Sequence, residues 1–189
     1  SAALLTGWYY AWENNLQSAL ADLDYLKRTQ ALENFQLFPA GLIADMVQDR
    51  NRAEVFYKSA YEKAGTSLRV VQAYGNYLER TGRKDQASKV YQLFLKSTQD
   101  NPLVRSALDA LKAGKKAEPF INTAESGAAE ALYSIAGALT DERSIDIALV
   151  YARLALSSYP EFSEGQTLLG EIYTQMKLHE QAIAAYDRI

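Results

Sequence analysis

The fold is decided by residues 74–94, which read YGNYLERTGRKDQASKVYQLF. Two segments with apolar side chains every three or four residues flank a polar break at residues 81–85. Residues three or four apart share one face of an α-helix, so Ala87 and Tyr91 are expected on one buried face. The stretch therefore predicts a helix, a tight turn and a second helix, and the small Gly75 lets the two helices approach closely.

The same pattern recurs every 34 residues along the chain. Such an interval is the mark of a repeat protein, in which each unit buries its apolar face against a neighbour. The matching positions are Gly7, Gly41 and Gly75; Ala19, Ala53 and Ala87; Leu23, Tyr57 and Tyr91; Leu26, Ala60 and Phe94; and later Ala136 with Gly170 and Ala148 with Ala182. Because independent columns agree on one interval, the sequence predicts a repeated helix pair.

This register resembles the tetratricopeptide repeat. The last unit carries the resemblance most completely, with Leu169-Gly170, Tyr173, Ala182 and Tyr186 in the family's positions. The resemblance covers nearly the whole chain, although the family's early aromatic residue is missing from most units. It implies an all-α, right-handed α-α superhelix of about five helix pairs with one inserted helix and loop. The chain looks like the central part of a longer bacterial tetratricopeptide protein.

The repeats divide residues 1–189 into a single predicted array. Its expected parts are repeats at about 1–33, 34–67 and 68–101, an insert at 102–128, a repeat at 129–162 and a truncated repeat at 163–189. Within the insert, Pro102 suits a helix start and Gly114 a helix end. A loop is expected from Lys115 to Ser126, and a new helix is expected to start near Ser126-Gly127. Because proline is costly inside a helix, the helix that contains Pro39 is expected to begin near Phe38. Both ends of the sequence fall inside repeats, so we expect a length cut from a longer array.

The composition excludes several classes of function. The chain has 189 residues, 20 Lys and Arg against 23 Asp and Glu, no Cys and one His. A net charge of −3 gives no basic face for nucleic acid, and no apolar run is long enough for membrane insertion. The one histidine, His179, lies among polar residues of a predicted turn and is expected to be solvated. The sequence therefore offers no histidine base to activate a nucleophile. We expect no enzyme, no cofactor and no metal site, and the location stays open between the bacterial envelope or periplasm and the cytoplasm.

The family resemblance implies a partner-binding concave face lined by the first helix of each unit. The positions concerned hold Leu4, Trp8, Trp12, Phe38, Leu42, Met46, Arg69, Gln72, Asn76, Arg80 and Tyr133. The first six are aromatic or apolar, and aromatic residues are common anchors of interfaces. They are therefore candidates for holding an apolar peptide or helix. The alternative is that they serve internal or inter-subunit packing, against preceding repeats or against an N-terminal segment folded into the groove.

Two functions remain open from the sequence. The first is a protein-interaction scaffold that binds a peptide or protein partner on its concave face. The alternative is a structural spacer, or a module that self-associates into a homo-oligomer through exposed ends of the array. The basic residues Lys112, Lys115 and Lys116 either belong to an insert that serves packing or meet an acidic partner.

Overall fold

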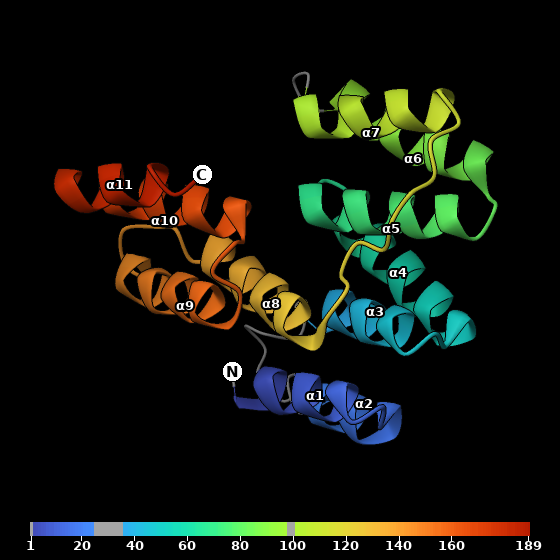
Figure 1. Ribbon diagram of the computed structural model, residues 1–189, viewed down its shortest axis with the longest axis horizontal. Helices are drawn as coiled ribbons and strands as arrows, with labels where there is room; N and C mark the ends of the chain where they lie inside the picture. Colours follow the sequence, from blue (N-terminus) through green and yellow to red (C-terminus); the bar gives the residue numbers. More distant parts are fainter. Residues whose placement is uncertain (1, 25–35, 98–100) are drawn as a thin grey trace. The chain divides into compact units, whose positions relative to one another are not determined.

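The computed structural model describes residues 2–24, 36–97 and 101–189, within which every regular element is a helix (Figure 1). The eleven helices described are α1 (Ala2–Trp12), α2 (Leu16–Asp24), α3 (Leu37–Met46), α4 (Arg50–Ala64), α5 (Leu68–Arg80), α6 (Lys84–Ser97), α7 (Pro102–Lys112), α8 (Ala124–Ala138), α9 (Ile145–Ser158), α10 (Ser163–Gln175) and α11 (His179–Tyr186). The prediction of an all-α protein built from helix pairs is confirmed.

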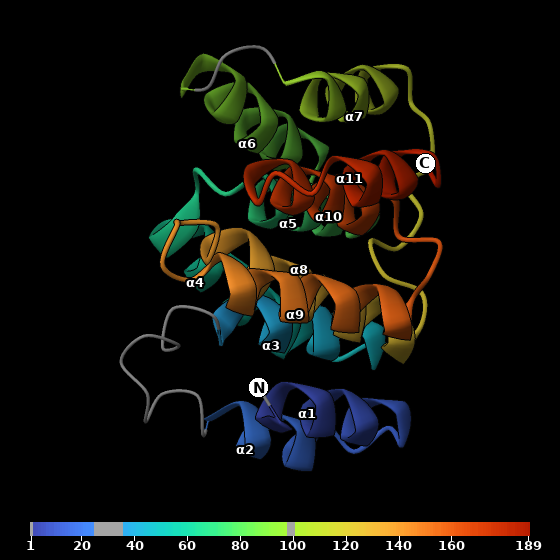
Figure 2. The same ribbon diagram turned by 90° about the vertical axis from the view of Figure 1, so that its left-hand side faces the viewer.

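The helices form two compact units, which are described separately. Unit 1 comprises Ser1–Thr29 and Thr123–Ile189, and unit 2 comprises Gln30–Asn122. In unit 1 the helices pair as α1–α2, α8–α9 and α10–α11 (Figure 2). Helix α1 also packs against α8. In unit 2, α3 pairs with α4 and α5 pairs with α6, while α7 covers α6. The single array over residues 1–189 stays a prediction.

In three of the units the glycine column of the repeat faces an aromatic ring, whereas Gly7 faces the carbonyl oxygen of Ala19 and the side chain of Leu23. A Cβ atom on Gly75 would lie 2.2 Å from Cε1 of Tyr91, and one on Gly170 would lie 2.5 Å from Cε1 of Tyr186. Gly41 lies against the Tyr57 ring in the same way. The sequence correctly indicated a close approach of paired helices, and the structure shows that the glycine makes room for a flat ring.

Four of the five turns between paired helices contain a left-handed residue that the sequence pattern did not reveal, and the α8–α9 turn does not contain one. Asn14, Gln48 and Gly82 have φ values of 58°, 62° and 83°, and Lys177 has 60°. At each of these four turns two backbone N–H groups bond back to helix carbonyls; for example, the N–H of Asp49 donates to the carbonyl of Ala44 at 2.9 Å. This is the Schellman arrangement that ends a helix. Because the residue types at these turn positions differ, a search for identical residues does not reveal them.

The predicted irregularities are found, with one shifted boundary. The first residue of α3 is Leu37, which places Pro39 in the first turn, where the missing N–H costs nothing. In the insert, α7 begins at Pro102 as predicted. The first residue of α8 is Ala124, two residues before the predicted start near Ser126-Gly127, and the side chains of Thr123 and Ser126 form a reciprocal cap on its first turn.

No helix in the described part of the chain is both long enough and apolar enough to cross a membrane.

Candidate functional site

Four of the predicted binding residues line one face of α5 in unit 2. Nη1 of Arg69 donates to Oε1 of Gln72 at 3.0 Å, and Nε of Arg80 donates to Oδ1 of Asn76 at 2.9 Å. The spacing of three or four residues puts all four side chains on the same side of the helix. The structure therefore brings these four residues together as a continuous polar face.

This polar face is covered by a segment of the same chain. Residues 115–122, here called the groove segment, follow α7 and form no helix or strand (yellow in Figure 1). Nδ2 of Asn76 donates to the backbone carbonyl of Glu118 at 2.8 Å, and the Arg69 guanidinium lies 4.6 Å from the centre of the Phe120 ring. Ile121, the next residue, is buried. The face of α5 thus already holds an irregular peptide by one backbone contact and one aromatic contact.

A cavity of about 360 Å³ lies beside the groove segment, between the ends of α3 and α5. Met46 lines it from α3, Tyr77 and Arg80 line it from α5, and Pro119 and Ile121 line it from the groove segment. A cavity of this size is within the range of small-ligand sites. The groove segment therefore fills only part of the groove between α3 and α5, and this cavity is the open part.

A partly buried polar cluster holds Arg80 at this site. The Arg80 guanidinium forms an ion pair with the carboxylate of Asp45, and the Tyr57 hydroxyl donates to Oδ2 of Asp45 at 3.2 Å. Burial and then the charge of Asp45 raise the pKa of Tyr57 well above its ordinary value, so the hydroxyl stays protonated as a donor. Residues from α3, α4 and α5 thereby hold one arginine at the edge of the groove.

A second polar link joins α5 to α6. The Tyr91 hydroxyl donates to Oε1 of Glu79 at 2.7 Å. Burial raises the pKa of the Glu79 carboxyl, and burial followed by the Glu79 contact raises that of Tyr91. Arg83 pairs with Glu54 and so ties the α5–α6 turn to α4. These links connect α5 and the turn that follows it to α6 and α4.

Most of the predicted apolar anchors lie elsewhere. Trp8 is 2% exposed and packs in unit 1, where a Cβ on Gly127 of α8 would lie 2.2 Å from its ring. Phe38 and Leu42 are buried in α3 of unit 2. The placement of these three side chains on an open surface is therefore corrected, because their apolar area is used in the core. This agrees with the alternative interpretation of internal packing.

The remaining predicted residues lie in unit 1 or at the edge of the groove. Trp12 is 66% exposed at the end of α1. Tyr133 is half-buried, and its ring lies edge-on to Phe162 at 5.2 Å. Leu4 belongs to α1, but its side chain lies outside the described residues. Met46 is half-buried and is the one predicted apolar anchor that faces the groove cavity.

Sequence reasoning missed the residues that occupy the groove. The groove segment was expected only as a loop in the insert. A signal was present, because Phe120-Ile121 is an apolar pair after Pro119 in a stretch that is otherwise mainly polar. Apolar pairs in loops usually have a surface to bury against. The repeat pattern could not say which surface that is.

The groups that the site presents are hydrogen-bonding and aromatic side chains. In the described part of the chain, no group of three or more His, Asp or Glu side chains is placed to hold a metal ion. His179 is exposed at the first residue of α11. The fold defines a helical-repeat protein, and one face of α5 in its unit 2 is covered by the groove segment.

The family comparison agrees with this class of protein. Residues 163–189 match the family model described as tetratricopeptide repeat. This stretch is the pair α10–α11, where the sequence carries the resemblance most completely. The predicted resemblance is confirmed, and the family indicated is a repeat family of interaction scaffolds, not a catalytic one.

Solved structures of MamA are also similar to this chain. MamA MSR-1 is 15% identical with a TM-score of 0.39, over 97% of this chain and 90% of that one. MamA AMB-1 has the same identity and TM-score over 97% and 85%, and a further MamA crystal structure has them over 96% and 91%. No curated relative matches this chain. At this level of similarity, no property of MamA is transferred to the chain.

Proposed function

We propose that this protein is an interaction scaffold whose unit 2 groove binds an extended peptide of a partner protein. The observation that carries the proposal is the groove segment itself. Asn76 binds the backbone carbonyl of Glu118, and Arg69 stacks on Phe120. A surface that holds one irregular peptide through its backbone and one aromatic ring is suited to hold another.

The contacts define the partner's chemistry. The carbonyl bond to Asn76 accepts any residue, whereas the contact with Arg69 favours an aromatic ring at one position. The burial of Ile121 favours an aliphatic residue directly after that ring. The proposed partner segment is therefore extended and carries an aromatic residue followed by an aliphatic one.

The groove segment competes with such a partner. A tethered segment has an effective concentration on the order of millimolar, so a partner must bind more tightly than the segment or arrive at high local concentration. The protein is therefore expected to bind weakly until the groove segment is displaced.

The experiment opens the groove and supplies the peptide separately. Residues 117–121 are replaced by Gly and Ser at unchanged length, and a fluorescent peptide with the sequence of residues 115–122 is titrated by anisotropy. We expect saturable binding to the opened variant and at least about ten-fold weaker binding to the unaltered chain, because the tethered segment competes. Equal binding to both proteins, or none to an opened variant that keeps its helical circular dichroism, would contradict the proposal. If the replacement prevents folding, the milder Phe120→Ala serves in its place.

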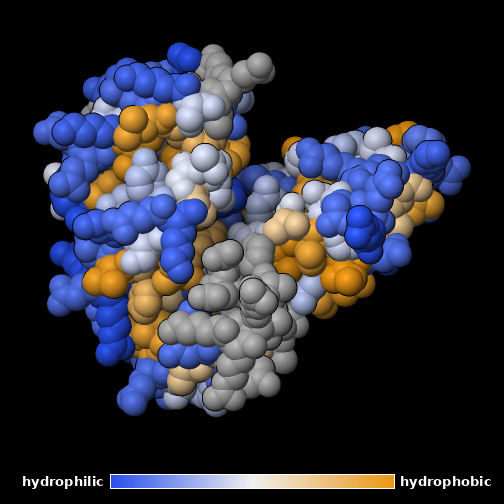
Figure 3. Space-filling view, turned by 180° about the vertical axis from the view of Figure 1, so that it is seen from behind, coloured by the Kyte–Doolittle hydropathy of each residue, from blue (hydrophilic) through white to orange (hydrophobic). Residues whose placement is uncertain are grey.

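Self-association is a second candidate function, favoured by one observation. The exposed face of α9 carries Ile147, Val150 and Leu154 at helical spacing. Seen from behind, apolar patches interrupt the hydrophilic surface (Figure 3). Exposed apolar patches often mark contact sites, here for a second copy of the chain.

Sedimentation velocity tests this candidate over a range of protein concentrations. If the face of α9 self-associates, Val150→Lys abolishes a concentration-dependent increase in mass. The exposed Val55 of α4 supplies a matched control, because Val55→Lys adds the same charge to another helix. A wild-type chain that stays monomeric at all concentrations would rule this candidate out.

A further inference from the structure

Asn76, which binds the groove segment, is itself held by an arginine. Nδ2 of Asn76 donates to the backbone carbonyl of Glu118 at 2.8 Å, and Oδ1 of Asn76 accepts from Nε of Arg80 at 2.9 Å. An arginine only donates hydrogen bonds, and a carbonyl only accepts them. With these two neighbours in place, the Asn76 amide therefore has one favourable orientation, in which its NH₂ group faces the peptide carbonyl.

Arg80 is in turn held by groups from two other helices. Its guanidinium forms an ion pair with the Asp45 carboxylate of α3, which accepts a hydrogen bond from the Tyr57 hydroxyl of α4 at 3.2 Å. The side chains of Arg80 and Asp45 are only 21% and 12% exposed, and partial removal from water strengthens such a pair. One chain of contacts thus runs from α4 through α3 to the Asn76 amide on α5.

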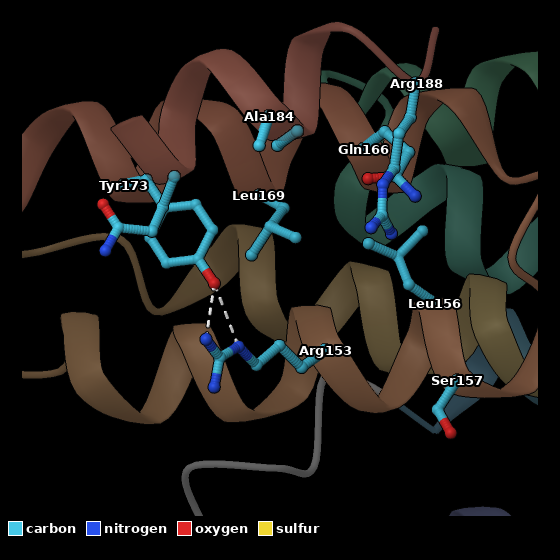
Figure 4. A pocket seen from close by; sticks show the side chains of 10 residues that line it. Arg153, Leu156, Ser157, Gln166, Leu169, Tyr173, Ala184 and Arg188 are labelled. Carbon is cyan, nitrogen blue, oxygen red and sulfur yellow. Dashed lines mark hydrogen bonds between the residues drawn. The ribbon is translucent and has the colours of Figure 1, made fainter. Parts of the chain in front are cut away.

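The two ends of the guanidinium serve different groups at Arg80, unlike at Arg153 of unit 1. Nε and Nη2 of Arg153 both donate to the hydroxyl oxygen of Tyr173, at 3.0 and 2.6 Å (dashed in Figure 4). Nε of Arg80 donates to Asn76, whereas Nη2 of Arg80 donates to Asp45. Because the guanidinium is planar and rigid, fixing Nη2 at Asp45 restricts where Nε points. Arg153 holds one group, and Arg80 couples two.

We propose that Arg80 is the positioning residue that makes the groove selective for a hydrogen-bond acceptor, namely a main-chain carbonyl of the bound peptide. Arg80 occupies the oxygen of the Asn76 amide and leaves only its N–H groups to the peptide. Without Arg80, the amide is free to turn over and present its oxygen, which repels a carbonyl. This inference rests on the proposed peptide-binding groove and adds how that groove selects its ligand.

The first test exchanges Arg80 for lysine in the otherwise unaltered chain. Arg80→Lys keeps a positive charge opposite Asp45, but its single ammonium replaces the rigid fork that reaches Asp45 and Asn76 together. Hydrogen exchange of the Asn76 side-chain amide is followed by NMR. We expect it to become at least about five-fold faster, because a hydrogen bond of this kind changes an equilibrium by about that factor. Arg52→Lys, the same change at an exposed arginine of α4, should leave it unchanged.

A single-atom change in the peptide then separates positioning from a purely structural role. The peptide with the sequence of residues 115–122 is made with oxygen or with sulfur, a weaker acceptor, at the Glu118 carbonyl. Binding is measured to the variant in which residues 117–121 are replaced by Gly and Ser. We expect the oxygen peptide to bind at least about five-fold more tightly. This preference should persist with Arg52→Lys and disappear with Arg80→Lys.

Two results would overturn the proposal. The first is an Asn76 amide whose exchange is the same in Arg80→Lys and in the unaltered chain. The second is a loss of affinity in Arg80→Lys that is equal for both peptides while the preference for oxygen remains. Failure of the proposed function differs from both, because neither peptide would then bind, and the exchange measurement would still decide the role of Arg80. If Arg80→Lys loses its helical circular dichroism, Asp45→Asn combined with Arg80→Gln removes both charges together and takes its place.

Discussion

At the scale of single residues, the fold depends on where a side chain is absent. The rings of Tyr57, Tyr91 and Tyr186 occupy the space that a Cβ would take at the repeat glycines of their own units. Gly137 belongs to no such contact, because nothing lies within 4 Å of a Cβ placed there. Glycines in helices therefore fall into two kinds here, those required by packing and those that only weaken the helix.

This distinction predicts opposite effects for two identical substitutions. Gly75→Ala should lower the free energy of unfolding by about 1–3 kcal/mol, because the methyl group overlaps the Tyr91 ring. Gly137→Ala should raise it by up to about 1 kcal/mol, because alanine favours the helix and meets no atom. Urea unfolding of the two variants measures both. A similar loss in both would mean that the glycine column has no packing role.

The left-handed turn residues give a second prediction at this scale. Gln48 has φ 62° and carries the steric cost of a side chain in that conformation, whereas Gly82 has φ 83° without it. Gln48→Gly should stabilise the protein by about 0.5–1 kcal/mol, and Gly82→Ala should destabilise it by about 1 kcal/mol. Thermal unfolding checks both changes. Shifts of the same sign would contradict the explanation, since no atom lies within 4 Å of a Cβ at Gly82.

At the scale of helices, the pairs were predictable and their caps were not. The interval of 34 residues located the helix pairs, because the buried positions recur at that interval along the chain. The start of α8 lies two residues before Ser126, near which the sequence predicts it, and its reciprocal cap uses Ser126 in place of the Glu or Gln that marks such caps in a sequence. The sequence predicted which residues of α5 share the covered face, because Arg69 and Asn76 fall at repeat positions. It did not predict that residues 115–122 cover this face, since the contact from Asn76 to Glu118 joins residues far apart in the sequence.

The link between α5 and α6 predicts a dependence on pH. Burial raises the pKa of Glu79 in the folded state, so its contribution to stability is greatest below its ordinary pKa of about 4.5 and is lost as pH rises through the raised value. Glu79→Gln, which keeps an acceptor for Tyr91, should therefore raise the Tm at pH 7 and have little effect below a pH of about 4. The exposed Glu62 provides a control as Glu62→Gln. A Tm gain for Glu79→Gln that persists unchanged at acid pH would contradict burial of the charge as its cause.

At the scale of the whole molecule, the repeat interval does not determine which pairs pack together. In unit 1, α1 packs against α8, far along the chain, and Trp8 lies against Gly127. A regular array would have placed α1 beside the next pair in sequence. The fit of one ring to one glycine decides this contact, and no periodic pattern contains it. For that reason Trp8 was predicted as a binding residue although it belongs to the core.

The candidate site likewise depends on contacts that the repeat interval does not contain. Repeat positions identify a face, and the function follows from what the face can hold. In unit 2 the polar residues of α5 hold the chain's own groove segment, which shows the geometry in which a peptide is bound. The central claim is that the same contacts would bind a partner peptide.

The most direct test measures how tightly the peptide with the sequence of residues 115–122 binds the opened variant, in which residues 117–121 are replaced by Gly and Ser. The measurement is repeated after one further substitution in that variant. Arg69→Ala removes the contact with the aromatic ring and should weaken binding about ten-fold, within the range of desolvated cation–π contacts and charged hydrogen bonds. Arg52→Ala removes an exposed arginine of α4 in the same unit and should leave the affinity unchanged. Equal affinities in the two variants would contradict the claim that the face of α5 is the peptide-binding site.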